Sequence, residues 1–320
     1  MIHKKRFIKD LKKDEFVEDV FLVRFKKPVE PYKNGYKFEL RLGDSSREIM
    51  FKLWGSNDEP LVKRIYDEIA LDDFVMIRAK VNEWNSNLEL SSNDLSAIQI
   101  IDRSEIDMKD FIKSSGRDVD DMYLELETYM DSVKDHDLRE FLNFLFSDKE
   151  LIHKFKNAPA SMYKHHNWVG GLLEHTLNVI SISLDILKVH DTLDRDLTLT
   201  GAIIHDIGKI DEFRMGSGIK VSDEGMLVGH ISQGLEIVTR ILSAIKIDKI
   251  KVMKLKHIIL SHHGELEYGS PKRPAFPEAL LIHYADEIDA KISSMQRAKS
   301  DANTEDNYIY TKDFENVFLR

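Results

Sequence analysis

The pattern of apolar and polar positions changes once along the chain. Between Glu15 and Ile101, apolar residues alternate with polar ones in short runs separated by turn residues, and a period of two is typical of half-buried β-strands. After Val119, apolar residues recur every three or four positions, which is typical of amphipathic helices. The sequence therefore predicts a strand-rich N-terminal part followed by a helical C-terminal part.

Five runs in the first part are predicted strands, and a segment with helical character, residues 59–71, follows the third of them. Five strands with a helix after the third is the order expected of an OB-fold barrel, a common fold for binding single-stranded nucleic acid. Another small antiparallel barrel or sandwich fits the pattern about as well. The predicted strands are residues 17–31, 36–44, 47–55, 73–85 and 88–101.

Residues 102–118 are mostly polar and are predicted to be a linker. We therefore expect an α+β multidomain protein, with an OB-like β-barrel at residues 1–101 and an all-α helical bundle at residues 119–320. The last stretch, residues 301–320, is polar with scattered aromatic residues and is a candidate docking segment.

Composition narrows the class of protein. A chain of 320 residues, 42% hydrophobic and 32% charged, is long enough for two globular domains. It contains no cysteine, which excludes disulfides, thiolate zinc sites and a cysteine nucleophile. The N-terminus lacks the apolar segment of a secretion signal, and no run approaches the roughly 18 apolar residues of a membrane span. We expect a cytoplasmic protein with no membrane partner.

The net charge of -10 is unevenly distributed. Residues 1–52 contain 14 Lys and Arg against 9 Asp and Glu, a balance of +5, whereas residues 102–150 contain 7 against 15, a balance of -8. An acidic chain as a whole repels a polyanion such as nucleic acid. A bound strand responds mainly to charges within a Debye length, about 10 Å at 0.1 M salt, so the basic N-terminal part still fits such a partner.

Histidine and aspartate residues recur at the ends of the predicted apolar helices or inside them. Imidazole and carboxylate groups that converge from separate helices can hold one or two divalent cations. A single histidine in an apolar helix is more often an ordinary core residue than a ligand. Burying the whole set without a cation would be costly, because ionisable groups inside a protein need partners. The predicted metal ligands are His175, His205, Asp206, His230, His262, His263 and Asp286.

Two sequence words in this region, GGLLEHT at residues 170–176 and HDIGK at residues 205–209, resemble the HD superfamily of metal-dependent phosphohydrolases. The resemblance extends from Ser161 to Lys291. Three further histidines would complete a site for a second ion that Asp206 bridges, or would contact the substrate phosphate if a single ion binds. The resemblance implies that one ion is held by His175, His205, Asp206 and Asp286, and that the other three are His230, His262 and His263.

The donor set suggests both the metal and the reaction. Mixed nitrogen and oxygen donors suit Mn²⁺, Fe²⁺, Co²⁺, Ni²⁺ or Zn²⁺ better than Mg²⁺, and the family resemblance favours manganese. A divalent ion activates water and neutralises charge on phosphoryl oxygens, which predicts phosphodiester hydrolysis. Lys209 shares a helix face with His205 and Asp206 and could place its ammonium on a phosphate, although a solvated lysine at a helix end is the alternative. Asp206 and Lys209 are the predicted catalytic residues.

Two further segments offer side chains for contacting the substrate. His165 and His166 lie with Trp168 before the first ligand, and histidine and tryptophan together can stack a base and contact a phosphate. The alternative is a capping loop in which Trp168 packs on the core. Lys272 and Arg273 lie in a Gly- and Pro-containing loop between the last two ligand helices, where they could bind the next phosphate or remain solvated.

Longer sequence motifs in this chain resemble the YhaM family of 3′-to-5′ exoribonucleases more closely than they resemble HD proteins in general. The resemblance covers nearly the whole chain, with an OB-like domain upstream as in that family. It implies a metal-dependent exonuclease that releases nucleoside monophosphates from the 3′ end of single strands. The words that carry it are residues 165–176, 205–209, 229–230, 261–279 and 283–291.

No motif identifies the strand-binding residues of the N-terminal part, so these are predicted from residue type alone. Because side chains on a strand alternate between two faces, several of the aromatic candidates must fill the barrel instead. The candidates are Tyr36, Phe38, Phe51 and Trp54 for stacking bases, and Lys26, Lys37, Arg41 and Lys52 for the phosphate backbone.

Two other functions stay open at this point. One is an HD-domain phosphohydrolase of a cyclic dinucleotide or a nucleoside triphosphate, with the OB domain as a regulatory module, and the acidic net charge favours it. The other is a nucleic-acid binder with a degenerate site, against which the intact ligand set argues. The sequence does not determine the preference for RNA over DNA, the number of ions, or whether the chain forms a homo-oligomer.

Overall fold

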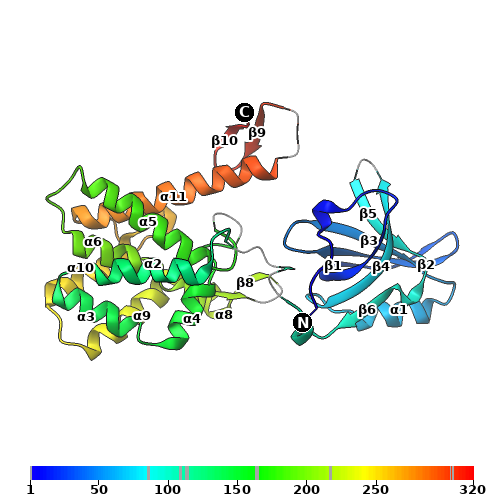
Figure 1. Cartoon of the computed structure of the whole chain (residues 1–320), viewed down its shortest axis with the longest axis horizontal. Coiled ribbons are helices and arrows are strands. Elements are labelled where there is room, and N and C mark those ends of the chain that lie inside the picture. Colours follow the sequence, from blue (N-terminus) through cyan, green and yellow to red (C-terminus); the bar gives the residue numbers. More distant parts are fainter. Residues whose placement is uncertain are drawn as a thin grey trace. The chain divides into compact units, whose positions relative to one another are not determined.

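The computed structural model of the protein describes residues 2–84, 87–107, 110–111, 115–162, 166–215, 218–302, 304 and 306–320. The chain divides into two compact units, an N-terminal one that runs to residue 113 and a C-terminal one that begins at residue 114. The first is rich in strands and the second in helices, which confirms the α+β class (Figure 1). No helix in the described part of the chain combines the length and apolar character that crossing a membrane requires.

The strands of the N-terminal unit close into a barrel. They follow the order β1-β2-β3-β5-β4, and pairing of β1 with β4 completes the ring, while β6 pairs with the beginning of β4. β3 and β5 pair in parallel, and helix α1 (Glu59–Glu68) connects β3 to β4. This connectivity is that of an OB fold, as predicted. The strands are β1 (Phe16–Tyr32), β2 (Gly35–Gly43), β3 (Glu48–Trp54), β4 (Phe74–Trp84), β5 (Asn87–Ser92) and β6 (Ile98–Ile101).

The alternation along β2 and β3 decides which aromatic side chains the barrel exposes. Phe38 and Phe51 have no exposed surface and lie in the barrel core with Leu40 and Leu53. The prediction that Phe38 and Phe51 stack bases is therefore wrong, because each points to the inner face of its strand. Tyr36 and Trp54 are only half-buried.

The predicted fifth strand is two strands in the structure. β5 ends at Ser92, and a 3₁₀ turn at Leu95–Ala97 separates it from β6. The carboxylate of Asp94 accepts a hydrogen bond from the backbone amide of Ser96 at 2.8 Å, which turns the chain between the two strands. The apolar alternation continues across this turn, and for that reason the sequence reads as one run.

The predicted linker begins too early. Ile106 and Phe111 are almost fully buried against Val20, Leu22 and Phe74 of the barrel. The rings of Phe74 and Phe111 meet edge to face with their centroids 4.9 Å apart. Much of the segment that the sequence marks as polar therefore belongs to the N-terminal unit, because two apolar side chains suffice to anchor it.

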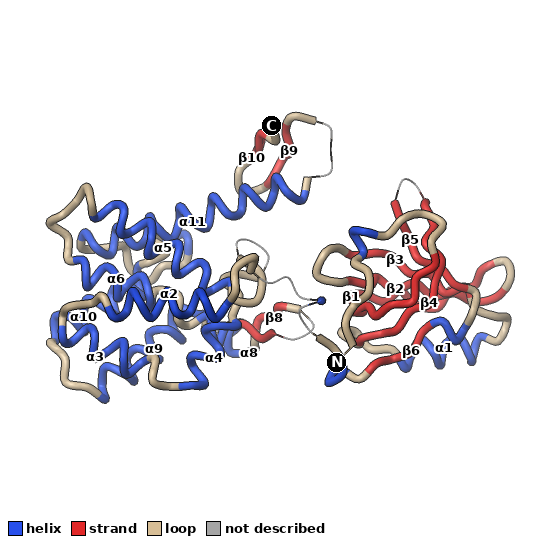
Figure 2. The backbone as a smooth tube through the Cα atoms, viewed as in Figure 1, coloured by secondary structure: helices blue, strands red, loops and turns tan. Residues whose placement is uncertain are grey.

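The C-terminal unit is a bundle of helices, several of which begin at an aspartate whose side chain accepts a backbone N–H. Figure 2 shows that two short hairpins accompany the helices, β7 (Phe213–Met215) with β8 (Ile219–Val221) and β9 (Tyr308–Thr311) with β10 (Glu315–Phe318). The predicted all-α bundle did not include them. The helices are α2 (Val119–Asp131), α3 (His136–Leu145), α4 (Lys149–Asn157), α5 (Gly171–Leu187), α6 (Arg195–Ile204), α7 (Lys209–Glu212), α8 (Asp223–Leu227), α9 (His230–Ala244), α10 (Lys249–Ser261) and α11 (Pro277–Asp301).

Candidate metal centre

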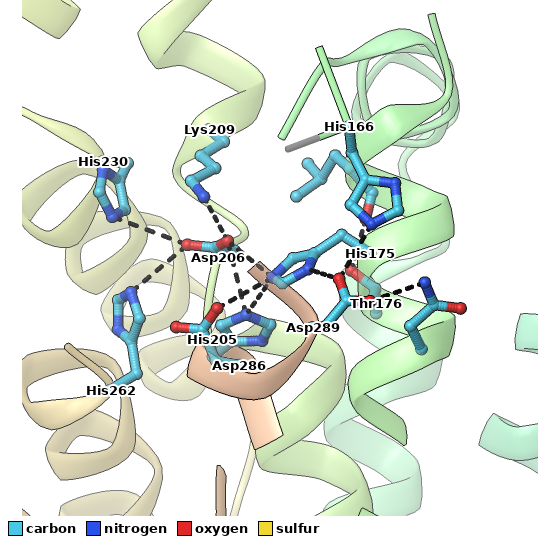
Figure 3. Close-up of polar contacts among 12 residues, drawn as sticks. His166, His175, Thr176, His205, Asp206, Lys209, His230, His262, Asp286 and Asp289 are labelled. Atoms are coloured by element: carbon cyan, nitrogen blue, oxygen red, sulfur yellow. Dashed lines mark hydrogen bonds and ion pairs between the residues drawn. The ribbon is translucent and has the colours of Figure 1, made fainter. Parts of the chain in front are cut away.

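The predicted metal ligands come together from five parts of the bundle (Figure 3). α5 contributes a histidine from its second turn, the segment after α6 contributes an adjacent His-Asp pair, and the start of α9, the end of α10 and the middle of α11 contribute the rest. The apolar faces of these helices form one continuous core, so their polar residues meet at a common centre. The predicted ligands are His175, His205, Asp206, His230, His262, His263 and Asp286, and Figure 3 labels all of them except His263.

One group of donors surrounds the Oδ2 atom of Asp206. His205 Nε2 lies 3.4 Å and His175 Nε2 lies 3.5 Å from this oxygen. His175 Nε2 also lies 3.2 Å from Asp286 Oδ1 and 3.3 Å from His205 Nε2. Donor atoms of all four residues lie within 4.8 Å of one another, as ligands of a single ion must.

A second group surrounds the other oxygen of the same carboxylate. Asp206 Oδ1 lies 3.3 Å from His262 Nε2 and 3.6 Å from His230 Nε2. His230 Nε2 is in turn 3.3 Å from His263 Nε2. The two oxygens of Asp206 thus face two separate sets of imidazoles, and this carboxylate would offer one oxygen to each set if cations were bound.

Hydrogen bonds on the far side of each ring determine which nitrogen points to the centre. His205 Nδ1 donates to the carbonyl of Ala202 at 2.8 Å, and His262 Nδ1 donates to that of Ile259 at 2.8 Å. His263 Nδ1 lies 3.1 Å from the carbonyl of Tyr268. A carbonyl only accepts, so Nδ1 carries the proton and each Nε2 directs a lone pair inward. Converging lone pairs repel one another unless a cation lies between them.

Burial also favours a cation. Asp206 Oδ1 and His262 Nε2 are buried and make no hydrogen bond with any described residue. Burial lowers the pKa of His262 to about 4, so this ring is neutral at pH 7. Burial opposes ionisation of Asp206, but the charge of Lys209 beside it acts in the other direction and helps to hold the pKa of Asp206 well below its usual range. A negative oxygen beside a neutral imidazole nitrogen is a donor pair that suits a divalent metal ion.

Lys209 lies against this carboxylate rather than in solvent. The side chain is mostly buried, and its Nζ lies 2.5 Å from Asp206 Oδ2. Gly208 makes room for this arrangement, because a Cβ at this position would lie 2.0 Å from the carbonyl oxygen of His230. The φ of Gly208 is -66°, an ordinary helical value, so backbone conformation does not require a glycine here. Its role is the close approach of α7 to α9.

Sequence reasoning missed two carboxylates that orient the ligands. Asp289 Oδ2 accepts from His175 Nδ1 at 2.6 Å, and Asn178 donates to Asp289 Oδ1 at 2.9 Å. Glu212 accepts from His230 Nδ1 at 3.2 Å. The spacing of Asp289, three residues after Asp286 on one helix, was a usable signal, because such residues lie on the same face.

His166 takes part in the same network, which overturns its predicted role. The ring is buried, its Nε2 lies 2.9 Å from Asp289 Oδ2, and Ser293 Oγ lies 3.2 Å from the same nitrogen. We predicted that His166 contacts the substrate at the rim, but its contacts place it behind His175. Trp168 donates from Nε1 to Glu174, in the first turn of α5, at 2.8 Å. The other predicted rim histidine, His165, lies outside the described residues.

Replacing Asp289 with asparagine is expected to weaken divalent metal binding by about 10- to 100-fold, the usual cost of losing a carboxylate behind a metal-bound histidine. The amide cannot hold the Nδ1 proton of His175 as firmly, so the ring loses its fixed orientation. Titration calorimetry with Mn²⁺ measures the affinity. Asp185→Asn, an exposed change on the same helix as His175, is the control. Equal affinity in both variants would contradict this orienting role.

A pocket of about 480 Å³ opens onto the ligand cluster, within the usual size range of small-molecule sites. It reaches Lys209 and Asp286 and continues along α11 to Lys291 and Ser294. Lys272 and Arg273, the loop residues that are predicted to bind a phosphate, are not among the described residues that line this pocket. Both are exposed, and Arg273 Nε pairs with Glu265 at 2.8 Å. Among the described residues that line the pocket, the second lysine besides Lys209 is Lys291.

The barrel carries a separate aromatic surface. The rings of Tyr32 and Trp54 meet edge to face at 4.9 Å and line a surface hollow of about 440 Å³ with Asn34, Ser56 and Asn93. The predicted stacking residue Trp54 is therefore available on the surface. Tyr36 instead hydrogen bonds to Glu59, which raises its pKa.

Several of the predicted backbone-binding lysines already have partners. Lys37 pairs with Glu30 at 2.8 Å and with Glu39 at 3.1 Å, and Lys52 pairs with Glu89 at 2.5 Å. Lys26 donates to the carbonyl oxygens of Tyr66 and Ile69 at the end of α1. Arg41 lies 3.8 Å from Glu48. Glutamates thus compensate the charges of Lys37, Lys52 and Arg41, and backbone carbonyls hold that of Lys26.

Comparison with known proteins adds independent findings. The model of the HD domain family matches residues 172–291. The 3′-5′ exoribonuclease YhaM of Shouchella clausii (strain KSM-K16) is 33% identical over 259 residues, which cover 81% of this chain and 78% of that protein. The 3′-5′ exoribonuclease YhaM of Bacillus subtilis (strain 168) is 31% identical over 268 residues, covering 83% and 82%. Among solved structures, the second OB-fold domain of replication protein A from Methanococcus maripaludis matches 32% of this chain and 97% of its own at 21% identity, with a TM-score of 0.26.

Proposed function

Because the chain belongs to the family of YhaM 3′-5′ exoribonucleases, we propose that it hydrolyses single-stranded RNA from the 3′ end and releases nucleoside 5′-monophosphates. The reaction takes place at the ligand cluster of the HD domain and depends on divalent metal. The observation that carries this proposal is the carboxylate of Asp206, whose two oxygens face two sets of histidine nitrogens.

The residues of the site divide the work between holding ions and holding substrate. Bound divalent ions supply an activated water and neutralise the negative charge of the phosphodiester. The inward Nε2 atoms and the carboxylates of Asp206 and Asp286 hold these ions. Lys209 keeps Asp206 ionised, and its place in the pocket lining lets it also donate to a phosphoryl oxygen.

Two Mn²⁺ ions are the occupants we propose. Imidazole and carboxylate donors suit first-row transition metals, and two donor groups that share one carboxylate match a pair of ions. Fe²⁺, Co²⁺, Ni²⁺ and Zn²⁺ fit the same donors, so supply decides which of them is bound. Activity recovered by each metal after removal with a chelator ranks them.

The barrel captures the strand in this proposal. Trp54 and Tyr32 present aromatic surface beside amide side chains, a combination that stacks bases with little dependence on sequence. Single-stranded DNA has the same bases and phosphates, so it is a second substrate class to test. The names of the relatives favour this function over hydrolysis of small nucleotides.

A 5′-labelled oligoribonucleotide is expected to yield a descending ladder of products when incubated with the Mn²⁺-loaded protein. A pocket of about 480 Å³ at the predicted metal ligands has room for one end of a strand, so a 3′-phosphate should slow degradation and a stable duplex should stop it. A circular oligoribonucleotide of the same sequence is the control and should persist. Rapid cutting of the circle would show endonuclease action, and turnover of cyclic or triphosphate nucleotides without any ladder would favour the small-nucleotide alternative.

A further inference from the structure

The C-terminal hairpin forms part of the pocket at the metal centre. β9 and β10 pair with Thr311 opposite Glu315, which leaves a turn of three residues, Lys312 to Phe314. Two of them, Asp313 and Phe314, line the pocket that also contains Asp286 and His262. A segment more than twenty residues after the last metal ligand in the sequence therefore shapes the space in which the substrate lies.

The hairpin is held in place by the fold. Val317 on β10 is only 2% exposed, and β10 contacts α11, the helix that carries Asp286. The amide of Phe314 donates to Thr311 Oγ1 at 3.1 Å, which closes the turn. Glu315 has a φ of 55°, and a left-handed residue after the turn is the usual geometry of a three-residue hairpin loop. These contacts position Phe314 without a bound ligand.

The pocket has the shape of a site for one nucleotide. Asp286, Ala290 and Ser294 lie one turn apart on α11, so the pocket follows this helix for about 12 Å from the metal ligands. The small side chain of Ala290 leaves room for a flat group. Phe314 is half-buried and Tyr268 is exposed, and both contribute aromatic rings to the lining. Charged side chains line the pocket beside the predicted metal ligands, and aromatic side chains line other parts of the same pocket.

We propose that Phe314 binds the base of the 3′-terminal nucleotide, so that the C-terminal hairpin is a substrate-binding element of the catalytic pocket. This inference rests on the proposed exoribonuclease function and extends it. The phosphodiester lies at the metal ligands, and the base stacks on the ring of Phe314. Stacking accepts every base, so the site holds the terminal nucleotide without selecting a sequence.

Two 5′-labelled oligoribonucleotides test this assignment, one with an ordinary 3′-terminal nucleotide and one with an abasic ribose at that position. For the wild type, removal of the base should lower kcat/KM by about 5- to 150-fold, the range that stacking of one base supports. Phe314→Ala should lower kcat/KM for the ordinary strand by the same factor and cause no further loss on the abasic strand. Phe314→Trp, which keeps an aromatic face, should retain discrimination between the two strands.

Phe318→Ala removes the same side chain from the same hairpin, outside the pocket lining, and should behave as the wild type. Equal losses on both strands for Phe314→Ala would mean that the hairpin only supports the fold, and no loss on either would also refute the inference. If Phe314→Ala gives either of these results while the wild type degrades the ordinary strand to a ladder of products, the proposed function stands and only the role of Phe314 is refuted. If the wild type produces no ladder, the proposed function fails, and this inference fails with it.

Discussion

Replacing Asp206 with alanine is expected to abolish hydrolysis of RNA and retention of metal together. Each oxygen of Asp206 faces a different set of histidines, so this one change removes a ligand from both sets. Metal ions contribute several kcal/mol to stabilising a phosphoryl transition state, so activity should fall by roughly a thousandfold or more. The decay of a 5′-labelled oligoribonucleotide measures activity, and elemental analysis after gel filtration measures metal content.

The control for this change is again Asp185→Asn, which should keep both metal and activity. Loss of a buried carboxylate also leaves Lys209 without its partner, so thermal melting of the Asp206 variant should be recorded beside its activity. A folded variant that turns over RNA at near wild-type rates would overturn the metal mechanism.

Deletion of residues 1–113 is expected to weaken degradation of long single strands by at least about a hundredfold while leaving a short chromogenic phosphodiester nearly unaffected. In the proposed function, strand capture and chemistry are assigned to different units, and each stacked base contributes about 1–3 kcal/mol, so loss of two stacked bases suffices for this effect. KM for oligoribonucleotides of increasing length measures the change.

The position of this deletion follows from the structure. A cut after residue 101 would leave Ile106 and Phe111 attached to the helical unit and stripped of the barrel residues that bury them. Trp54→Ala in the full-length chain is the matched variant, since it removes one aromatic side chain of the barrel surface and leaves the boundary intact. Equal losses on long and short substrates after the deletion would mean that the barrel is needed for the helical unit to fold.

The order of strands could be predicted from the sequence alone, and so could the convergence of the histidines and aspartates proposed as metal ligands. Alternation along β1 to β4 leaves little choice of which side chains face inward, because a half-buried strand needs an apolar residue at every second position. The candidate ligands were recognisable because few residue types bind divalent cations, and because a charged residue among apolar positions of a helix, such as Asp286, needs a partner.

Other features depend on neighbours that are distant in the sequence. An aspartate that orients a ligand, such as Asp289, has the same letter as one that faces solvent. A lysine that pairs with a glutamate on the next strand, such as Lys37, looks like one that is free to bind phosphate. Charge along the sequence therefore overstated the basic surface of the barrel, since ion pairs form across strands.

Local patterns determined the identity and order of the elements, because hydrophobic period and ligand chemistry are properties of short segments. The tertiary structure alone decided which oxygen of Asp206 faces which histidines, that His166 lies behind His175, and that the turn at Phe314 lines the pocket. Each of these depends on contacts between segments far apart in the chain, and such contacts are made by the packing of the whole bundle.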